Sequence, residues 1–254
     1  MEPDDPHGPV HPPRRLRRIL RALRVVARLS VTLALGTGMA LSGWWLLTSP
    51  DTPVPTEWNP LEPLDLSRPQ VAVTGMKMRR ALRSSAGCAA ALRTGAVFEA
   101  LPPREGPGQC GIVDRVRLTE VGGARLDPLE TSCSVALRLA AWERYGLRPA
   151  AATLGAGVTR LYHQGSYNCR PIRGGTRLST HATAEAVDIR AVGLDDGRIL
   201  SLVSGWSAPG GIGGFWRAAH GAACEWFVTV LGPDYNRLHA DHFHMQSVGW
   251  GACR

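Results

Sequence analysis

An uncharged apolar stretch near the N-terminus constrains the fold of this chain more than any other feature. Leu29 to Leu47 read LSVTLALGTGMALSGWWLL, without one charged side chain. Such a run is about as long as a helix must be to cross the hydrocarbon core of a bilayer. We therefore expect residues 29–47 to form one transmembrane helix, with a short tail before it and a long exported part after it.

The charges on either side of this stretch predict its orientation. Residues 1–28 contain seven arginines against three acidic residues, and Asp51 and Glu57 follow the stretch. Because positive charge favours the cytoplasmic side, we expect a basic cytoplasmic tail over 1–28 and a periplasmic C-terminal part, in a single-pass protein of the inner membrane. A cleavable signal peptide is the alternative, although no A-x-A-like site follows Trp45.

The distribution of charge also bears on the partners of the chain. The formal net charge is +8, and about half of it lies in the N-terminal tail. The remainder is nearly balanced, with no basic run interleaved with aromatic residues. Because recognition of nucleic acid needs a basic face, we expect no nucleic-acid partner and attribute the basic tail to the membrane.

All six cysteines lie beyond the apolar stretch, and none of them forms a CxxC pair. An even number of cysteines in an exported domain predicts disulfides. Sequence alone allows fifteen connectivities, and one or two free buried cysteines are the alternative. We expect the pairing of nearest neighbours, which gives Cys88–Cys110, Cys133–Cys169 and Cys224–Cys253.

Six prolines within residues 48–70 predict an extended spacer, so we expect the compact domain to span residues 71–254. Hydrophobic periodicity predicts its secondary structure. The expected helices are 76–93, 127–145 and 215–231, and the expected strands are 111–113, 116–118, 158–163, 186–192 and 199–203, with one more through the C-terminal histidines. This pattern indicates an α+β domain with a small antiparallel sheet and flanking helices, stapled by disulfides.

Three of the eight histidines, His239, His242 and His244, lie within six residues. If this segment ends in a strand, His242 and His244 point to one face, while Phe243 and Met245 point into the core. A lone HxH pair is often incidental. A partner from elsewhere in the chain is needed before the segment predicts a metal site.

That partner is a stretch that contains His181 and Asp188, seven residues apart. Catalytic zinc is held by three protein ligands, commonly histidines with a carboxylate, and keeps a fourth position for water. His244 is the natural third ligand, which makes Zn²⁺ the expected cofactor. His242 suits the role of general acid and base, and His239 could orient the water or hydrogen-bond an oxyanion.

Several of these polar residues also have simpler interpretations. Asp188 can be a capping or salt-bridged carboxylate, for example with Arg190. Asp241 either faces away from the site or fixes an imidazole tautomer. Arg170 can hold a peptide carboxylate bidentately or form a surface salt bridge. Ser179 suits a capping role better than that of a nucleophile, since no general base is arranged for it.

The spacing Ser-x-His-x6-Asp, followed downstream by His-x2-His-x-His, resembles that of the peptidoglycan metallopeptidases, which include murein endopeptidases and D-Ala-D-Ala peptidases. The resemblance implies that His181, Asp188 and His244 bind zinc. It also implies that His242 is a catalytic acid and base and that His239 is a further active-site residue.

The bacterial extensin-like C-terminal domain is the closer overall resemblance, over about residues 70–254. The segments that carry it are Tyr167–Arg170, Ser179–Asp188, Leu231–Asn236, His239–His244 and Gly251–Arg254. One departure concerns the peptidases, which usually have glycine three residues after the first ligand. This chain has Thr183-Ala184 in that region.

These features together predict a membrane-anchored, periplasmic, zinc-dependent hydrolase of peptidoglycan peptide bonds. Its expected partners are the inner membrane and peptidoglycan. A catalytically silent extensin-like domain that binds the wall or acts as a scaffold is the alternative. The presence of both non-ligand histidines, His239 and His242, favours the enzyme, because a silent domain could lose them freely.

Overall fold

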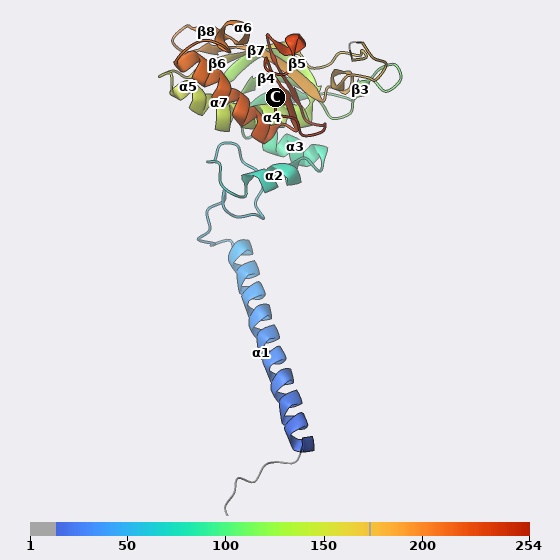
Figure 1. Cartoon of the computed structure of the whole chain (residues 1–254), viewed down its shortest axis with the longest axis vertical. Coiled ribbons are helices and arrows are strands. Elements are labelled where there is room, and N and C mark those ends of the chain that lie inside the picture. The colour runs from blue at the N-terminus through green and yellow to red at the C-terminus, as the bar shows by residue number, and fades with distance from the viewer. Residues whose placement is uncertain (1–13, 173) are drawn as a thin grey trace, which may run out of the picture. The chain divides into compact units, whose positions relative to one another are not determined.

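The computed structural model describes residues 14–172 and 174–254, so about half of the predicted basic tail lies outside the described residues. The chain divides into two compact units, one that ends at Pro55 and one that runs from Thr56 to Arg254. Figure 1 shows both units.

Among its described residues, the N-terminal unit contains one long helix, α1 (Arg14–Thr48). It contains the whole uncharged stretch, and its described side chains are almost all exposed. It is long and apolar enough to cross a membrane, but a signal sequence near an N-terminus meets the same criteria. The expected apolar helix is therefore confirmed, while its orientation and its retention as an anchor stay predictions.

The C-terminal unit contains a mixed sheet whose strand order is β1-β4-β5-β6-β7-β10-β9, with β8 paired to β7. Its strands are β1 (Ala96–Ala100), β4 (Arg115–Val121), β5 (Ala124–Ser132), β6 (Val158–Gly165), β7 (Ala186–Leu194), β8 (Ile199–Ser201), β9 (Thr229–Leu231) and β10 (Phe243–Gln246). A separate hairpin joins β2 (Arg104–Glu105) to β3 (Gly111–Ile112). Every pair is antiparallel except β5 with β6.

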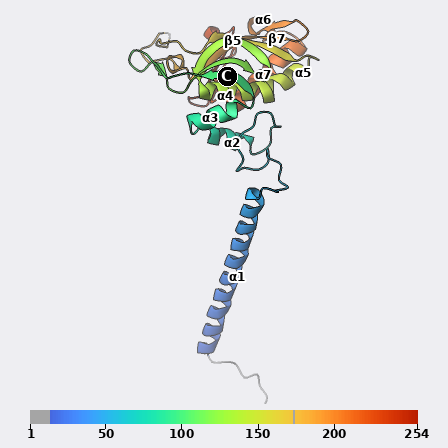
Figure 2. The same ribbon diagram turned by 180° about the vertical axis from the view of Figure 1, so that it is seen from behind.

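Helices pack on one side of this sheet, where α4, α5 and α7 lie together in both views (Figures 1 and 2). The α-helices are α2 (Thr74–Ala81), α3 (Ser85–Leu92), α4 (Cys133–Trp142), α5 (Arg148–Ala152), α6 (Leu202–Gly205) and α7 (Gly211–Trp226). Three short helices of other types are η1 (Glu143–Leu147), η2 (Thr180–Thr183) and η3 (Arg237–His239). The α+β class with flanking helices is therefore confirmed.

The side chains of β10 alternate, so its apolar residues and its polar residues lie on opposite faces of the sheet. Phe243 and Met245 are fully buried in the core, on the side of the helices, and Phe243 packs against Trp216 of α7. Successive side chains of a strand point to opposite faces, so His244 and Gln246 belong to the face away from those helices. The predicted inward direction of Phe243 and Met245 is confirmed.

Residues 56–70, which we expected to belong to an extended spacer, pack on the domain instead. Leu64 and Leu66 are buried in its core, and Arg144 donates a hydrogen bond of 3.2 Å to the carbonyl of Leu66. A cavity of about 310 Å³ lies between this segment and α2, and Lys77 is among the residues that line it. Proline content therefore predicted the absence of regular structure but not the docking of the segment.

Three element boundaries differ from the prediction because polar caps and tertiary packing override the periodicity. The expected helix 76–93 is two helices, since Ser84 accepts a hydrogen bond from the Gly87 amide and starts α3. The expected helix 127–145 begins only at Cys133, where Ser132 caps α4 and the preceding residues belong to β5. The expected helix 215–231 ends at Trp226, and its last residues form β9.

All six cysteines form disulfides, which pair Cys88 with Cys133, Cys110 with Cys169, and Cys224 with Cys253. The expected pairs Cys88–Cys110 and Cys133–Cys169 were wrong, and Cys224–Cys253 was right. The β4–β5 hairpin returns the chain so that the start of α4 packs against α3. Proximity in space, rather than in sequence, decides the partner.

Candidate metal centre

The candidate site is built around two adjacent strands on the face of the sheet away from the helices. β10 pairs with β7 in a register that places His244 directly opposite Asp188. Directly opposite residues of an antiparallel pair have Cβ atoms about 5 Å apart. His244 Nδ1 consequently lies 2.8 Å from Asp188 Oδ1.

His181 reaches the same point from η2, the short helix that precedes β7. Ser179 caps this helix by accepting a hydrogen bond from the amide of His181, as expected. The ring of His181 is held by the carbonyl oxygen of Ser166, 2.7 Å from Nδ1. Because a carbonyl only accepts, Nδ1 carries the proton, and Nε2 is left to face the cluster.

The three predicted ligands converge on one point. His181 Nε2 lies 3.1 Å from His244 Nδ1 and 3.2 Å from Asp188 Oδ2. Ligands bound tetrahedrally at the usual zinc distances lie about 3.3 Å from one another. His181 and His244 are buried and Asp188 is nearly so. The donor set, its spacing and its burial therefore fit a zinc ion without rearrangement of the backbone.

The electrostatics of the cluster follow from its charge pairing. Burial disfavours the charged form of Asp188, but hydrogen bonds from His181 and His244 outweigh burial and hold the pKa of the carboxyl well below its usual range. Burial likewise acts to lower the pKa of His181, yet the bond to Asp188 and its negative charge raise that pKa above its ordinary value. A cation at this point would replace the second proton of His181, the one on Nε2, and leave the proton on Nδ1 in place.

This chain lacks the glycine that the peptidases usually have three residues after the first ligand, but its backbone turns there as a glycine would. Ala184, three residues after His181, adopts a left-handed conformation with φ 54° and ψ 30°. It is the one described residue other than glycine with positive φ. Glycine adopts this conformation without strain, whereas alanine pays roughly 1 kcal/mol. The loop therefore has the shape that glycine would favour, although the residue differs.

His242 lies immediately before β10, with its ring next to the three ligands. Its Nε2 is 3.7 Å from Asp188 Oδ1, and its Nδ1 is 2.9 Å from Asp241 Oδ1. Of the two interpretations of Asp241, a residue that faces away and a partner of an imidazole, the contact with His242 agrees with the second. The strand begins only at Phe243, so alternation does not apply before it.

His239 lies at the end of η3, and its ring centroid is 5.4 Å from that of His242 and 5.6 Å from that of His244. Asn236 caps this helix: its Oδ1 accepts from the amide of Leu238 and lies 2.8 Å from His239 Nδ1. Burial and the two neighbouring histidines lower the pKa of His239 to about 4, so this ring is neutral at neutral pH.

Arg170 lies on an exposed loop next to the cluster. A bridge between Pro171 and Leu178 closes this loop, and the disulfide of Cys169 with Cys110 fixes its base. The positive charge of Arg170 acts on His181, whose pKa it tends to lower. The exposed guanidinium donates a hydrogen bond of 3.4 Å to the carbonyl of Pro171. Among residues 14–172 and 174–254, no carboxylate forms an ion pair with it.

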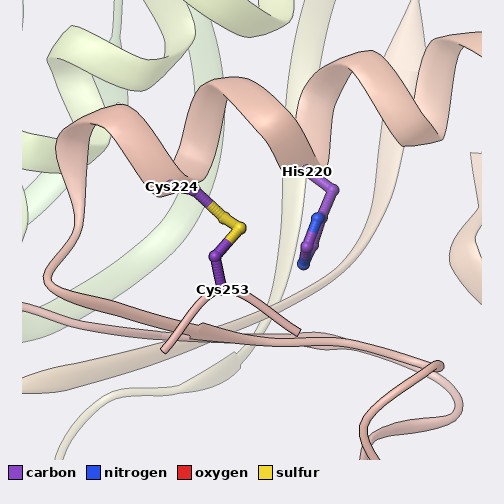
Figure 3. Close-up of side chains that lie close together, drawn as sticks. All are labelled: His220, Cys224 and Cys253. Carbon is purple, nitrogen blue, oxygen red and sulfur yellow. A yellow bond between two sulfur atoms is a disulfide. The ribbon is translucent and has the colours of Figure 1, made fainter. Parts of the chain in front are cut away.

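A second group of metal-binding residue types lies on the other side of β10, where His220 packs against Phe243. Figure 3 shows its three side chains close together. His220 and Cys224 are one turn apart on α7, and Cys253 comes from the C-terminal segment. Here, however, the two sulfurs are joined in a disulfide. His220 Nε2 lies 3.2 Å from the carbonyl of Arg254, and its ring packs against Phe243. In this oxidised form the group is a structural staple for the C-terminus.

Sequence reasoning missed two residues that contact the ligands. Ser166 holds His181 through its backbone carbonyl, which no side-chain pattern can reveal. The side-chain nitrogen of Gln246 lies 2.8 Å from His244 Nε2. Its position two residues after His244 was a usable signal, since strand residues i and i+2 share a face.

Comparison with known proteins identifies the family. The model of the extensin-like protein C-terminus matches residues 86–254, about two thirds of the chain. No curated protein and no solved structure matches the chain. The matched region contains His181, Asp188, His239, His242 and His244. The chain therefore belongs to the extensin-like C-terminal family.

Proposed function

We propose that this protein is a zinc-dependent hydrolase of peptide bonds in peptidoglycan, exported and anchored by α1. The observation that carries the proposal is the convergence of His181, Asp188 and His244 within ligand distance, with two further histidines beside them. A structural charge cluster would explain the three ligands but not His242 and His239.

The three ligands would hold the ion through Nε2 of His181, Nδ1 of His244 and a carboxylate oxygen of Asp188. Zinc in such a site supplies a water of lowered pKa and polarises a carbonyl. Ser166 keeps the proton of His181 away from the ligand nitrogen, as carbonyl partners of ligand histidines commonly do.

His242 is placed to move a proton. Asp241 lies at its Nδ1 and fixes the ring, so Nε2 faces the cluster and is available to take a proton and pass it to a leaving amine. The hydrogen bond with His242 lowers the pKa of Asp241. Asp241 therefore stays ionised and accepts a hydrogen bond from Nδ1 of the ring.

His239 suits one of its two expected roles better than the other. Asn236 Oδ1 already accepts from a backbone amide, so His239 Nδ1 must donate to it. Nε2 of the neutral ring then carries a lone pair and can only accept. This favours the orientation of a water molecule over hydrogen bonding to an oxyanion.

The substrate class rests on charge and location. Arg170 and Arg177 are exposed at the loop closed by the Pro171–Leu178 bridge, and the charge of Arg170 acts on His181. An exposed guanidinium can bind a carboxylate bidentately, and peptide stems of the bacterial wall carry such groups. The disulfides and α1 agree with an exported domain that meets this substrate outside the cytoplasm.

Incubation of the full chain in detergent with purified sacculi tests the proposal. We expect soluble muropeptides to appear with zinc, to disappear with a chelator and to return when zinc is restored. Arg170→Ala should weaken substrate binding, while Arg125→Ala, on β5, is the matched control. If the zinc-loaded protein binds sacculi and releases nothing, the domain is a wall-binding scaffold and the proposal is wrong.

A further inference from the structure

The surroundings of the two ligand histidines differ in one respect. His181 is fixed by a group that can only accept, because the carbonyl of Ser166 lies at its Nδ1. In His244 the second ring nitrogen, Nε2, lies 2.8 Å from the side-chain amide nitrogen of Gln246. A carboxamide presents either a donor or an acceptor, depending on which way it is turned.

The orientation of that amide is linked to the position of the His244 proton. With the nitrogen of Gln246 toward the ring, the amide donates to Nε2, and the proton of a neutral ring lies on Nδ1, directed at Asp188 Oδ1. Binding of a cation through Nδ1 needs that nitrogen free of its proton. The proton must then lie on Nε2, and the amide must turn so that its oxygen accepts.

From this geometry we propose that Gln246 is a positioning residue that selects the tautomer of His244, with its amide turned one way in the metal-free site and the other way in the loaded site. The inference rests on the proposed metal function. It goes beyond that function by assigning a role to a residue outside the ligand set and the histidine cluster.

The fold holds Gln246 where this role requires it. Gln246 lies on the same face of β10 as His244, and its backbone pairs with Ala186 and with Thr229. Its carbonyl also accepts from the amide of Val228, which fixes the end of the strand. Only the side chain is left free to turn.

Space for this rotation comes from Gly249. A Cβ at Gly249 would lie 3.4 Å from Gln246 Oε1 and 2.5 Å from Thr229 Oγ1. The φ of +130° at Gly249 also disfavours any side chain there. The backbone therefore passes close to the amide without filling the space beside its oxygen.

Two substitutions in the full chain, kept in detergent, test the role of Gln246. Gln246→Leu removes the acceptor at similar size, and we expect zinc affinity, measured by competition with a chromophoric chelator, to fall about 10- to 100-fold. Gln246→Glu can only accept and should keep affinity within a few-fold of wild type or tighten it. Gln164→Leu is the matched control, because Gln164 contacts Asp241 and no ligand; its zinc affinity should not change.

Nitrogen-15 spectra of labelled histidine in the metal-free chain provide a readout that does not depend on zinc. We expect His244 to carry its proton on Nδ1 in the wild type and to carry a proton on Nε2 in Gln246→Glu. Unchanged zinc affinity in Gln246→Leu, or an Nε2 without a proton in Gln246→Glu, would overturn the inference. A wild type that binds no zinc but shows the tautomer change would refute the metal function and leave the control of the His244 tautomer by Gln246 standing.

Discussion

Two groups of metal-binding residue types lie on opposite faces of β10, and they differ in what they can do. His181, Asp188 and His244 form one group, and His220, Cys224 and Cys253 form the other, each with ligand atoms within 4.8 Å of one another. In the first group all three donors can offer a lone pair to an ion, the two histidines once the ligand nitrogen has released its proton. In the second the disulfide has consumed two of the three donors.

Proximity of donor atoms does not by itself make a metal centre. The first group combines unlike charges, a fixed tautomer at His181 and two further histidines. The second joins a helix to the C-terminus and packs its half-buried histidine against Phe243. The first group has the donors and the spacing that a metal ion needs, whereas the second joins the C-terminal segment to α7.

The largest expected effect separates the two groups by zinc content. His181→Ala should remove the zinc of the purified chain, because two remaining ligands do not hold the ion. His220→Ala should keep about one zinc per chain. Elemental analysis after dialysis measures both. A loss of zinc in His220→Ala with zinc retained in His181→Ala would reverse the assignment.

Next to the first group, His242→Ala should separate catalysis from metal binding. We expect zinc content to stay at the wild-type level and release of muropeptides to fall about 10²- to 10⁴-fold, the usual contribution of a general acid and base. Activity that stays at the wild-type level in this variant would remove His242 from the mechanism.

Replacement of both Cys224 and Cys253 by serine tests the structural role of the second group. The disulfide closes a loop with a sequence separation of 29, so its removal should lower the free energy of unfolding by about 3 to 4 kcal/mol. Thermal unfolding measures this loss. The zinc content should be unchanged, and a folded double variant that loses its zinc would contradict the division of roles.

The ligands of the first group and the disulfide of the second could be predicted from the sequence, because each depends on the pattern within short segments of the chain. His181, Asp188 and His244 were identified because spacing and strand alternation limit where such side chains can point. The apolar helix and the α+β class followed from composition and periodicity in the same way. Cys224–Cys253 was the one disulfide paired correctly, since both members lie near the C-terminal end of the chain.

The parts that could not be predicted depend on contacts between distant segments. The β4–β5 hairpin brings Cys133 to Cys88, and no local pattern encodes that return. The Ser166 carbonyl acts through the backbone, so its residue type gives no signal. Asp241 was ambiguous because the start of β10 at Phe243 depends on pairing with β7.

The pH dependence of the metal-free cluster gives a smaller effect. The pKa of Asp188 is lowered on folding, so its contribution to stability is present in full above the unfolded value near 3.9 and is lost as pH falls through the folded value. With a chelator present, Asp188→Asn should be less stable than wild type by about 2 kcal/mol at pH 7. Thermal unfolding should show the difference shrinking below about pH 4, and a difference independent of pH would contradict the charge pairing.

The smallest expected effect concerns the loop that places His181. Ala184 is fully buried with positive φ, so Ala184→Gly relieves roughly 1 kcal/mol of strain while it removes one buried methyl group worth about 0.8 kcal/mol. We expect the free energy of unfolding to change by less than about 1 kcal/mol and zinc binding to be kept. Ala184→Val should destabilise by about 2 kcal/mol or more, because a β-branched residue is rare at positive φ and the site has no spare volume. If both variants unfold like the wild type, the left-handed turn is not what holds His181 in place.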